Sequence, residues 1–434
     1  MQEMDLTGHW AGILSLIIFL VAYVMVIFEE TLHMRKSKPV MLAAGLIWAL
    51  IGIAFAMAGH SEAAHAHARE IIEEYGELFL FLLVAITYVN TLEERRAFDV
   101  LRVKLIGLGL GYRQLFLLTG ILAFVLSSTL DNLTTALVMG AVAMALGRDN
   151  PRFVVLACVS VVVASNAGGA FSPFGDITTL MVWQKGKLEF FEFFQLVLPS
   201  IVNWLVPAAI LYYAVPNERP SADVQTLRGK PGMIGVAVLF ALTIATAVSF
   251  KNFLHLPPAL GMMLGLGYLQ IWSYYLRMSG SQRGDGDMVL DSFKEVQRIE
   301  WDTLLFFFGI IFAVGGLGVL GYLSMASELL YTDLGSTTAN IIIGALSAVV
   351  DNIPLMFAVL TMDPAMSDGE WLLITLTAGT GGSMLSIGSA AGVALMGQAR
   401  GVYTFGAHLK WSWAIALGYV AAIAAHLVLN ARLF

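Results

Sequence analysis

Long apolar runs with almost no charge recur along the whole sequence. A helix needs roughly 20 apolar residues to cross the hydrocarbon core of a bilayer. Runs close to this length lie at 10–28, 39–58, 78–92, 191–215, 232–250, 257–275, 301–323 and 409–430, and longer ones at 114–147, 152–183, 336–363 and 369–398. Only 13% of the 434 residues are charged, whereas soluble domains carry roughly 25%. Because a membrane span must satisfy its own backbone hydrogen bonds, we expect an all-α polytopic membrane protein.

The first apolar run is interpreted as a retained span. Residues 1–9 carry Glu3 and Asp5 and lack the basic residues that precede a signal peptide core, and the basic residues at 35–38 follow the run instead. The single cysteine, Cys158, excludes a disulfide framework within the chain. No glycine-rich phosphate loop of the Walker type supports ATP-driven transport.

Two of the long runs, 114–147 and 336–363, hold an Asp-Asn pair near their centres. We interpret them as re-entrant hairpins, which leaves ten full spans. Most of the 24 Lys and Arg residues then lie in cytoplasmic loops, as the positive-inside rule expects. If the first hairpin were a full span, the basic segments 216–231 and 276–300 would lie outside. This topology predicts that both termini face the outside.

The two halves of the chain share two motifs in the same order. SSTLDNLTTAL at 127–137 is similar to SAVVDNIPLMF at 347–357, and SNAGGAFSPFGD at 165–176 to AGTGGSMLSIGS at 378–389. Each half would contain five spans and one hairpin, so an odd number of spans inverts the second half. The predicted parts are a first inverted repeat at 1–215 (hairpin 114–147, broken helix 152–183), a cytoplasmic linker at 216–231, and a second inverted repeat at 232–434 (hairpin 336–363, broken helix 369–398). A chance match of short motifs is the alternative.

The motifs predict irregular backbone inside the membrane, which is tolerated only where protein or a water-filled cavity satisfies it. The Asp-Asn pairs would occupy hairpin tips, and Asn166 to Thr179 and Gly379 to Ser389 would be unwound breaks rich in glycine. These elements carry many oxygen atoms and no Lys or Arg, which favours a hard cation over an anion. The candidate ligands are Asp131, Asn132, Thr134, Thr135, Ser165, Asn166, Ser172, Asp176, Thr178, Thr179, Asp351, Asn352, Ser383, Ser386 and Ser389.

Carboxylates inside a membrane also suggest proton coupling. An ionised Asp near the bilayer centre costs at least about 2.5–3.5 kcal/mol, and a bound proton or cation lowers that cost. We expect Asp131 and Asp176 to exchange a proton for a cation. The alternative is that each aspartate only caps a broken helix. Asp351 is the weaker candidate, because Pro354 stands where the first half has Thr134. It is either an accessory ligand or part of the scaffold.

Three segments resemble the NhaD-type sodium/proton antiporters of bacteria, members of the wider ion transporter superfamily. These are SSTLDNLTTALVM at 127–139, SNAGGAFSPFGDITTLMVW at 165–183 and GTGGSMLSIGSAAGVALMG at 379–397. The resemblance spans nearly the whole chain. It implies an inner-membrane antiporter that exports Na⁺ or Li⁺ against H⁺ without a cofactor, favoured at alkaline pH and serving pH homeostasis. It also implies a homodimer in which a mobile transport domain moves against a scaffold domain. The implied site residues are Asp131, Asn132, Thr134, Asn166, Asp176, Thr178, Thr179, Asp351, Ser383 and Ser386.

Other functions stay open from the residues alone. A cation-coupled carrier of a small anion, such as a di- or tricarboxylate, would need donors for the anion. An intramembrane aspartyl protease could use Asp131 and Asp176, but SPFGD lacks the first glycine of the GxGD pattern. A passive channel is a third alternative, and no nucleic-acid partner is implied. His60, His65 and His67 either sense pH or lie in a solvated outside loop.

Overall fold

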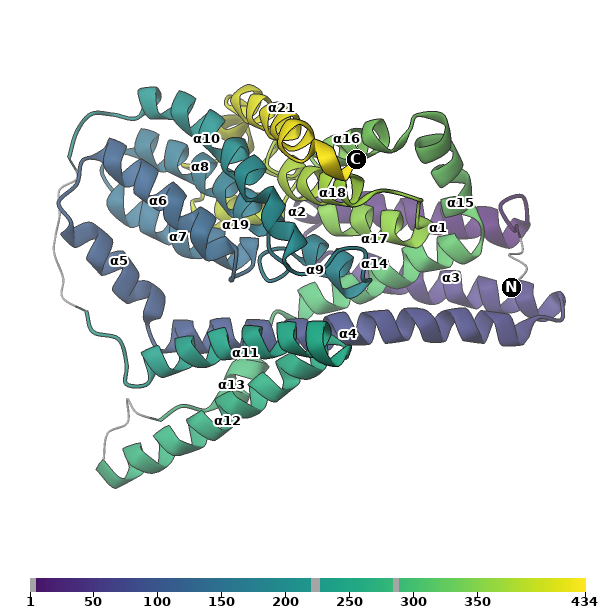
Figure 1. Cartoon of the computed structure of the whole chain (residues 1–434), viewed down its shortest axis with the longest axis horizontal. Coiled ribbons are helices and arrows are strands. Elements are labelled where there is room, and N and C mark those ends of the chain that lie inside the picture. Colours follow the sequence, from purple (N-terminus) through teal and green to yellow (C-terminus); the bar gives the residue numbers. More distant parts are fainter. Residues whose placement is uncertain (1–4, 220–226, 284–288) are drawn as a thin grey trace. The chain divides into compact units, whose positions relative to one another are not determined.

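The computed structural model describes residues 5–219, 227–283 and 289–434, and in these ranges it contains helices and no β-strand (Figure 1). Within these ranges, eight helical segments are long and apolar enough to cross a membrane. They are α1 (Trp10–Ile27), α3 (Ser37–Met57), α4 (Ser61–Glu94), α8 (Pro151–Ala170), η1 with α10 (Glu192–Ala214), α11 (Met233–Leu254), α14 (Trp301–Val319) and α21 (Ser412–Leu429). The prediction of an all-α polytopic membrane protein is therefore confirmed.

The chain divides into two compact units. The described part of unit 1 lies within Met1–Leu80, Glu300–Ala339 and Ile353–Met366. In it α3 packs along both α1 and α14, and the indole nitrogen of Trp48 donates to the Phe312 carbonyl at 2.9 Å. The smaller elements of this unit are α2 (Glu29–Leu32), α15 (Tyr322–Ser327), η3 (Glu328–Asp333) and most of α17 (Asn352–Met362).

Unit 2 lies within Phe81–Ile299, Asn340–Asn352 and Ser367–Phe434. Helix α8 is deeply buried, and almost every residue from Phe153 to Ala170 is shielded from solvent. The helices that pack against α8 are α6 (Tyr112–Ser127), α7 (Asn132–Leu146), α9 (Ile177–Gln184), α10, α18 (Asp368–Gly381), α19 (Ala390–Gln398) and α20 (Phe405–Leu409). Unit 2 also contains the end of α4, η1, α11, α21, α5 (Ala97–Gly107), α12 (Pro258–Arg283), α13 (Ser292–Gln297), most of α16 (Ser336–Leu346), and η4 (Ala431–Leu433).

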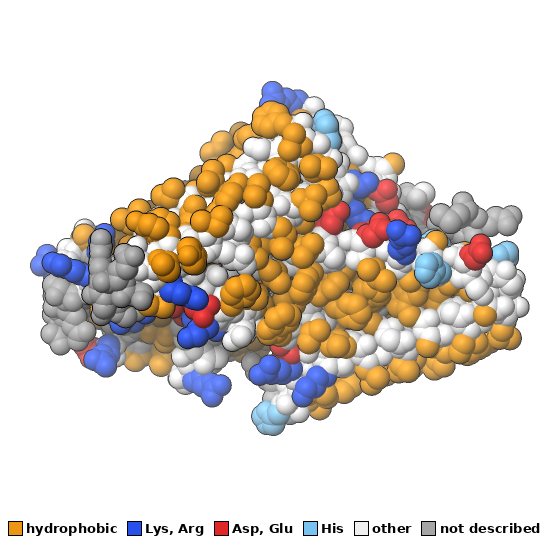
Figure 2. All heavy atoms as spheres, turned by 90° about the horizontal axis from the view of Figure 1, so that it is seen from below, with side chains coloured by type: hydrophobic (Ala, Val, Ile, Leu, Met, Phe, Trp, Pro, Cys, Tyr) orange, Lys and Arg blue, Asp and Glu red, His pale blue; other side chains and the backbone are white. Residues whose placement is uncertain are grey.

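The surface is apolar over large areas. Hydrophobic side chains form large patches on the face shown in Figure 2. On α11, for example, Ile234, Val238 and Leu242 are exposed, and on α12 Ile271 is exposed. Such side chains suit contact with lipid tails, and α11 and α12 pack along each other as a pair in Figure 1.

Both predicted hairpins are interrupted at the Asp-Asn pair. Helix α6 ends at Ser127 and α7 begins at Asn132, and in the second half α16 ends at Leu346 and α17 begins at Asn352. Each interruption separates two helices that are too short to cross a full bilayer comfortably. That these pairs are re-entrant stays a prediction.

The predicted extent of the two breaks was wrong. Helix α8 continues to Ala170 and α18 to Gly381, so only residues 171–176 and 382–389 lie outside helices. The glycines before each break stay helical and allow other backbone to pack closely on them. A Cβ on Gly168 would lie 2.1 Å from the Phe124 carbonyl oxygen, and one on Gly381 would lie 1.9 Å from that of Gly344.

The segment before the third span was predicted to be a loop and is helical instead; its location on the outside stays a prediction. Residues from Ser61 onward belong to α4, a single helix of 34 residues, so His65 and His67 lie in its first turns. The segment is rich in alanine, the best helix former. The ion pair between Arg69 and Glu73, four residues apart, adds support on the same helix face.

Candidate functional site

Two aspartates hold the start of the helix that follows each of them. Asp131 caps α7, where its Oδ1 accepts the Thr134 backbone N–H at 2.8 Å and its Oδ2 accepts the Thr134 hydroxyl at 2.7 Å. Asp176 caps α9, where its Oδ1 accepts the backbone N–H and the hydroxyl of Thr178, both at 3.0 Å. A carboxylate is favourable at a helix N-terminus, where unpaired N–H groups point at it.

Asp176 also receives one amide from each Asp-Asn pair. The side-chain nitrogen of Asn132 lies 3.4 Å from its Oδ2, and that of Asn352 lies 3.2 Å from the same oxygen. The carboxylate is only 4% exposed. Residues 220 positions apart in the sequence therefore meet at one buried charge.

A second set of bonds joins α8 and the start of α7 to the second break. Asn166 of α8 accepts from the Asn132 amide at 3.1 Å and donates to the Ser383 hydroxyl at 2.8 Å. Asn166 and Ser383 are fully buried. The structure thus brings together six predicted residues in unit 2, namely Asn132, Asn166, Asp176, Thr178, Asn352 and Ser383.

Other predicted ligands have different partners. The Thr179 hydroxyl donates to the Ala170 carbonyl at 3.3 Å, and the Ser386 hydroxyl lies 3.2 Å from the sulfur of Met396. Asp131 and Thr134 bond to each other at the start of α7. Asp351 is half-buried and directly precedes Asn352.

Sequence reasoning missed two serines that tie the hairpins to the broken helices. The Ser127 hydroxyl donates to the Ser165 carbonyl at 2.6 Å, and the Ser347 hydroxyl donates to the Ala378 carbonyl at 3.0 Å. Both serines occupy the same place in the repeated motif, four residues before its Asp, and that register was the available signal.

The glycines of the two breaks also make matching approaches. A Cβ on Gly169 would lie 2.6 Å from the Gly175 carbonyl oxygen, and a Cβ on Gly382 would lie 2.6 Å from that of Gly388. The two motifs therefore share local packing as well as sequence. The inverted orientation of the repeats stays a prediction.

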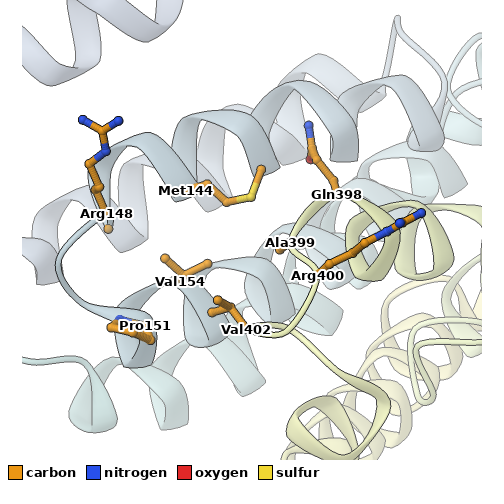
Figure 3. Close-up of a pocket in the computed structure, with 9 residues that line it drawn as sticks. Met144, Arg148, Pro151, Val154, Gln398, Ala399, Arg400 and Val402 are labelled. Carbon is orange, nitrogen blue, oxygen red and sulfur yellow. The ribbon is translucent and has the colours of Figure 1, made fainter.

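A cavity of about 360 Å³ lies elsewhere in unit 2 (Figure 3). It opens beside Gly147 and Gln398, at the C-terminal ends of α7 and α19. The Asp-Asn pair and the second break lie at the opposite, N-terminal ends of these helices. The side chains of Arg148 and Arg400 extend in different directions from it in Figure 3. This cavity is separate from the Asp176 cluster.

The Asp176 cluster has the chemistry of a cation or proton site. Its partners in the described part of the chain are side-chain amides, one hydroxyl and a backbone N–H, and all of them donate to the carboxylate. The amides and the hydroxyl also carry neutral oxygen atoms, the kind of ligand that hard cations prefer. An aspartyl dyad needs two carboxyl groups that share a proton, but Asp131 and Asp176 each bond to the threonine that follows them. The geometry does not favour a protease.

This chain is similar to known transporters over nearly its full length. The family model described as "Citrate transporter" matches residues 23–379. The Na⁺/H⁺ antiporter NhaD of Alkalimonas amylolytica is 55% identical over 99% of this chain and 93% of its own. That of Vibrio cholerae is 52% identical over 100% and 95%, and sodium/proton antiporter 1 of Arabidopsis thaliana is 34% identical over 95% and 72%.

The membrane-spanning helices and the relatives identify a polytopic membrane transporter rather than an enzyme. Within that class, the chain belongs to the NhaD family of the ion transporter superfamily.

Proposed function

We propose that this chain exports Na⁺, or Li⁺, in exchange for H⁺, with Asp131 and Asp176 carrying the exchange. The observation that supports this most is the convergence of Asn132 and Asn352 on the buried Asp176 carboxylate. The relatives named as Na⁺/H⁺ antiporters, at 52–55% identity over the full chain, support the choice of ions.

The amides give the site two states. In the structure, Asn132 and Asn352 turn their NH₂ groups toward Asp176. A side-chain amide carries a donor and an acceptor on one carbon, so a half turn presents its oxygen instead. Na⁺ would then bind between the carboxylate and neutral oxygens from Asn132, Asn166, Thr134, Thr178 and Thr179, with Asp351, Asn352, Ser383 and Ser386 as ligands from the second half.

The transport cycle follows from competition for the carboxylates. Na⁺ binds from the inside and displaces protons from Asp131 and Asp176, the loaded site becomes accessible outside, Na⁺ leaves, and protons return. Two carboxylates against one Na⁺ permit two protons per Na⁺, so net positive charge moves inward. Each charge moved gains about 2.3 kcal/mol per 100 mV, and exchange is therefore electrogenic.

Alternating access is proposed to be of the elevator type. Unit 2, which holds the Asp176 cluster, would include the mobile transport domain, and unit 1 would belong to the scaffold. Each unit takes segments from both halves of the sequence, as expected for inverted repeats that each contribute to both domains. The proposal includes a homodimer in the bacterial inner membrane with both termini outside.

A second candidate is a cation-coupled carrier of a small carboxylate anion. The description of the matching family model favours it. The buried Asp176 carboxylate does not, because its negative charge would repel an anion bound beside it.

Proteoliposomes containing the purified protein test the proposal. Adding Na⁺ to vesicles with an imposed pH gradient should release protons from the acidic lumen, monitored with a pH-sensitive dye, and choline should not. Asp176→Asn keeps a side chain that can cap α9 but removes the charge, and it should abolish the flux.

The matched control is Asp99→Asn, an exposed aspartate on α5 that pairs with Arg102; this variant should transport normally. Full Na⁺-dependent proton flux in Asp176→Asn would refute the mechanism. Uptake of radiolabelled citrate with no Na⁺-dependent proton flux would favour the second candidate.

A further inference from the structure

The second break is held by a histidine that lies outside the repeated motifs. The Nε2 atom of His408, on α20, lies 2.9 Å from the Ser383 carbonyl oxygen. Its Nδ1 atom lies 2.6 Å from the hydroxyl oxygen of Tyr403. His408 is 0% exposed and Tyr403 is 1% exposed.

The partners define the direction of each hydrogen bond. A carbonyl oxygen only accepts, so the Nε2 atom of His408 carries a proton and donates to Ser383. In a neutral imidazole the other nitrogen then accepts, and the Tyr403 hydroxyl donates to it. Two bonds on opposite sides of the ring fix its orientation, much as the second nitrogen of a metal-binding histidine is fixed by its partner.

In the first break, the equivalent carbonyl accepts a hydrogen bond from a residue of the same motif. Ala170 follows Gly169 as Ser383 follows Gly382, so their carbonyl groups are equivalent in the two motifs. The Ala170 carbonyl accepts from Thr179, three residues after Asp176. The residue in the place of Thr179 in the second half is Gly392, three residues after Ser389.

Gly392 has no hydroxyl and no room for one. A Cβ at this position would lie 2.2 Å from the Ser386 carbonyl oxygen. A threonine would therefore collide with the backbone of the break itself. The donor that the first half takes from its own motif must come from elsewhere in the second half, and His408 supplies it.

We propose that His408 is a positioning residue for the cation site. By holding the Ser383 carbonyl, it orients the hydroxyl of Ser383 toward Asn166, which in turn contacts Asn132 beside Asp176. This inference rests on the proposed Na⁺/H⁺ exchange at Asp176. His408 neither binds the cation nor carries the proton.

The test compares the apparent KM for Na⁺ with the maximal rate in proteoliposomes. His408→Ala should raise the KM about 10-fold or more, since loss of a group that orients a metal ligand typically costs 10–100-fold in affinity, with a smaller effect on the maximal rate. His408→Gln can still donate to Ser383 and accept from Tyr403, so it should recover most of the affinity and keep the wild-type pH profile. Tyr403→Phe should raise the KM a few-fold, as expected for one lost hydrogen bond.

His426→Ala is the matched control. His426 is also buried and also contacts a backbone carbonyl, that of Gly369 at 2.9 Å, but at the other end of α18 from the break. Its KM should equal that of the wild type.

Three outcomes would overturn the inference. One is a wild-type KM in His408→Ala. Another is a shifted pH profile with a normal KM in His408→Gln, which would make the ring a proton carrier. The third applies if His408→Ala does not fold. In that case the inference fails if Tyr403→Phe has a wild-type KM for Na⁺ and His408→Gln has no lower KM than other substitutions of His408. If the wild type itself shows no Na⁺-dependent proton flux, the proposed function fails instead.

Discussion

Asp176 receives hydrogen bonds from residues in both halves of the sequence. Asn132 and Asn352 reach the same Oδ2 atom, and Thr178 occupies the other oxygen. The two Asp-Asn pairs are similar in sequence. In the structure their asparagines share one partner, Asp176, which belongs to the first half of the chain. The asymmetry of the site therefore lies in the breaks, where Asp176 corresponds to Ser389.

Because the two amides share one carboxylate, their contributions to Na⁺ binding should not add. We expect Asn132→Ala and Asn352→Ala each to raise the apparent KM for Na⁺ about 10-fold, and the double variant to raise it by much less than the product, since residues with a shared partner are energetically coupled. Na⁺-dependent proton flux in proteoliposomes gives the three values. Independent effects would contradict a shared partner.

The charge and the capping role of Asp131 can be separated. Asn caps a helix about as well as Asp, whereas Ala costs about 1 kcal/mol at this position. Asp131→Asn should therefore unfold close to the wild-type temperature yet lose proton-coupled Na⁺ flux. Asp131→Ala should lose the flux and also unfold at a lower temperature. Thermal unfolding in detergent and flux in proteoliposomes measure the two effects. Normal flux in Asp131→Asn would assign Asp131 to capping alone.

Most residues of the cluster could be predicted because their chemistry is unusual inside an apolar run. Asp176, Asn132 and Asn352 are polar groups that a membrane helix rarely carries without a function. His408 could not be identified in this way, because it lies 25 residues beyond Ser383 and only packing brings them together. The glycine at 392 was the available signal, since it marks a donor missing from the second motif.

The two helix breaks contribute residues to the site. The glycines before them provide space for neighbouring backbone, rather than the unusual backbone conformations that glycine permits. Gly168 and Gly381 stay helical and admit the backbone of α6 and α16, respectively. The positions of the breaks were predictable from Pro173 and the paired glycines, but their extent depends on which backbone packs against each residue. That information is absent from a local motif.

Substitution of these helical glycines should destabilise unit 2. A Cβ on Gly168 or Gly381 would overlap a carbonyl oxygen, and overpacking typically costs about 1–3 kcal/mol. Gly168→Ala and Gly381→Ala should therefore unfold at lower temperature, measured in detergent. Gly52→Ala on α3 is the control, because a Cβ there meets nothing within 4 Å, and alanine favours a helix by up to about 1 kcal/mol. Equal stability of all three variants would contradict close packing.

At the scale of the whole molecule, a buried charge network joins segments that are distant in sequence. Arg95 at the end of α4 is fully buried and donates to the carbonyls of Pro231 and Val289. Nearby, Asn90 donates to the carbonyl of Glu295, whose carboxylate pairs with Arg298 at 2.9 Å. The network connects α4 to the segments that precede α11 and α14.

This network should make stability depend on pH. Burial raises the pKa of the Glu295 carboxyl, the charges of Glu94 and Glu93 act in the same direction, and Arg298 opposes them. The folded state thus binds this proton more tightly than the unfolded chain, so the resulting stabilisation is present at low pH and lost as the pH rises through the folded pKa.

Glu295→Gln removes this titration. Its unfolding temperature relative to the wild type should rise as the pH increases from about 4 to about 7, across the usual titration range of a glutamate, as measured by thermal unfolding. Glu62→Gln, at an exposed glutamate, controls for a change of surface charge and should show no such rise. A difference for Glu295→Gln that falls with pH would contradict the assignment.

Relative movement of the two units can be measured with spin labels. In a Cys158→Ala background, labels at exposed Met57 in unit 1 and exposed Tyr213 in unit 2 report between units. The elevator proposal predicts that this distance distribution differs between Na⁺ at alkaline pH and acidic pH without Na⁺. Labels at Tyr213 and Val428, both in unit 2, should keep their distance. Identical distributions for the first pair would exclude this movement.

Asp176 caps α9 through its Oδ1 atom, and the same carboxylate is the one that we propose binds the cargo. It caps α9 through Thr178 while it lies at the centre of the cluster. By linkage, any ion that draws charge away from this carboxylate weakens the start of α9, and the helix weakens ion binding by the same amount. The affinity of the site therefore has a ceiling set by the fold, which suits a transporter because a cargo held without such competition would leave too slowly.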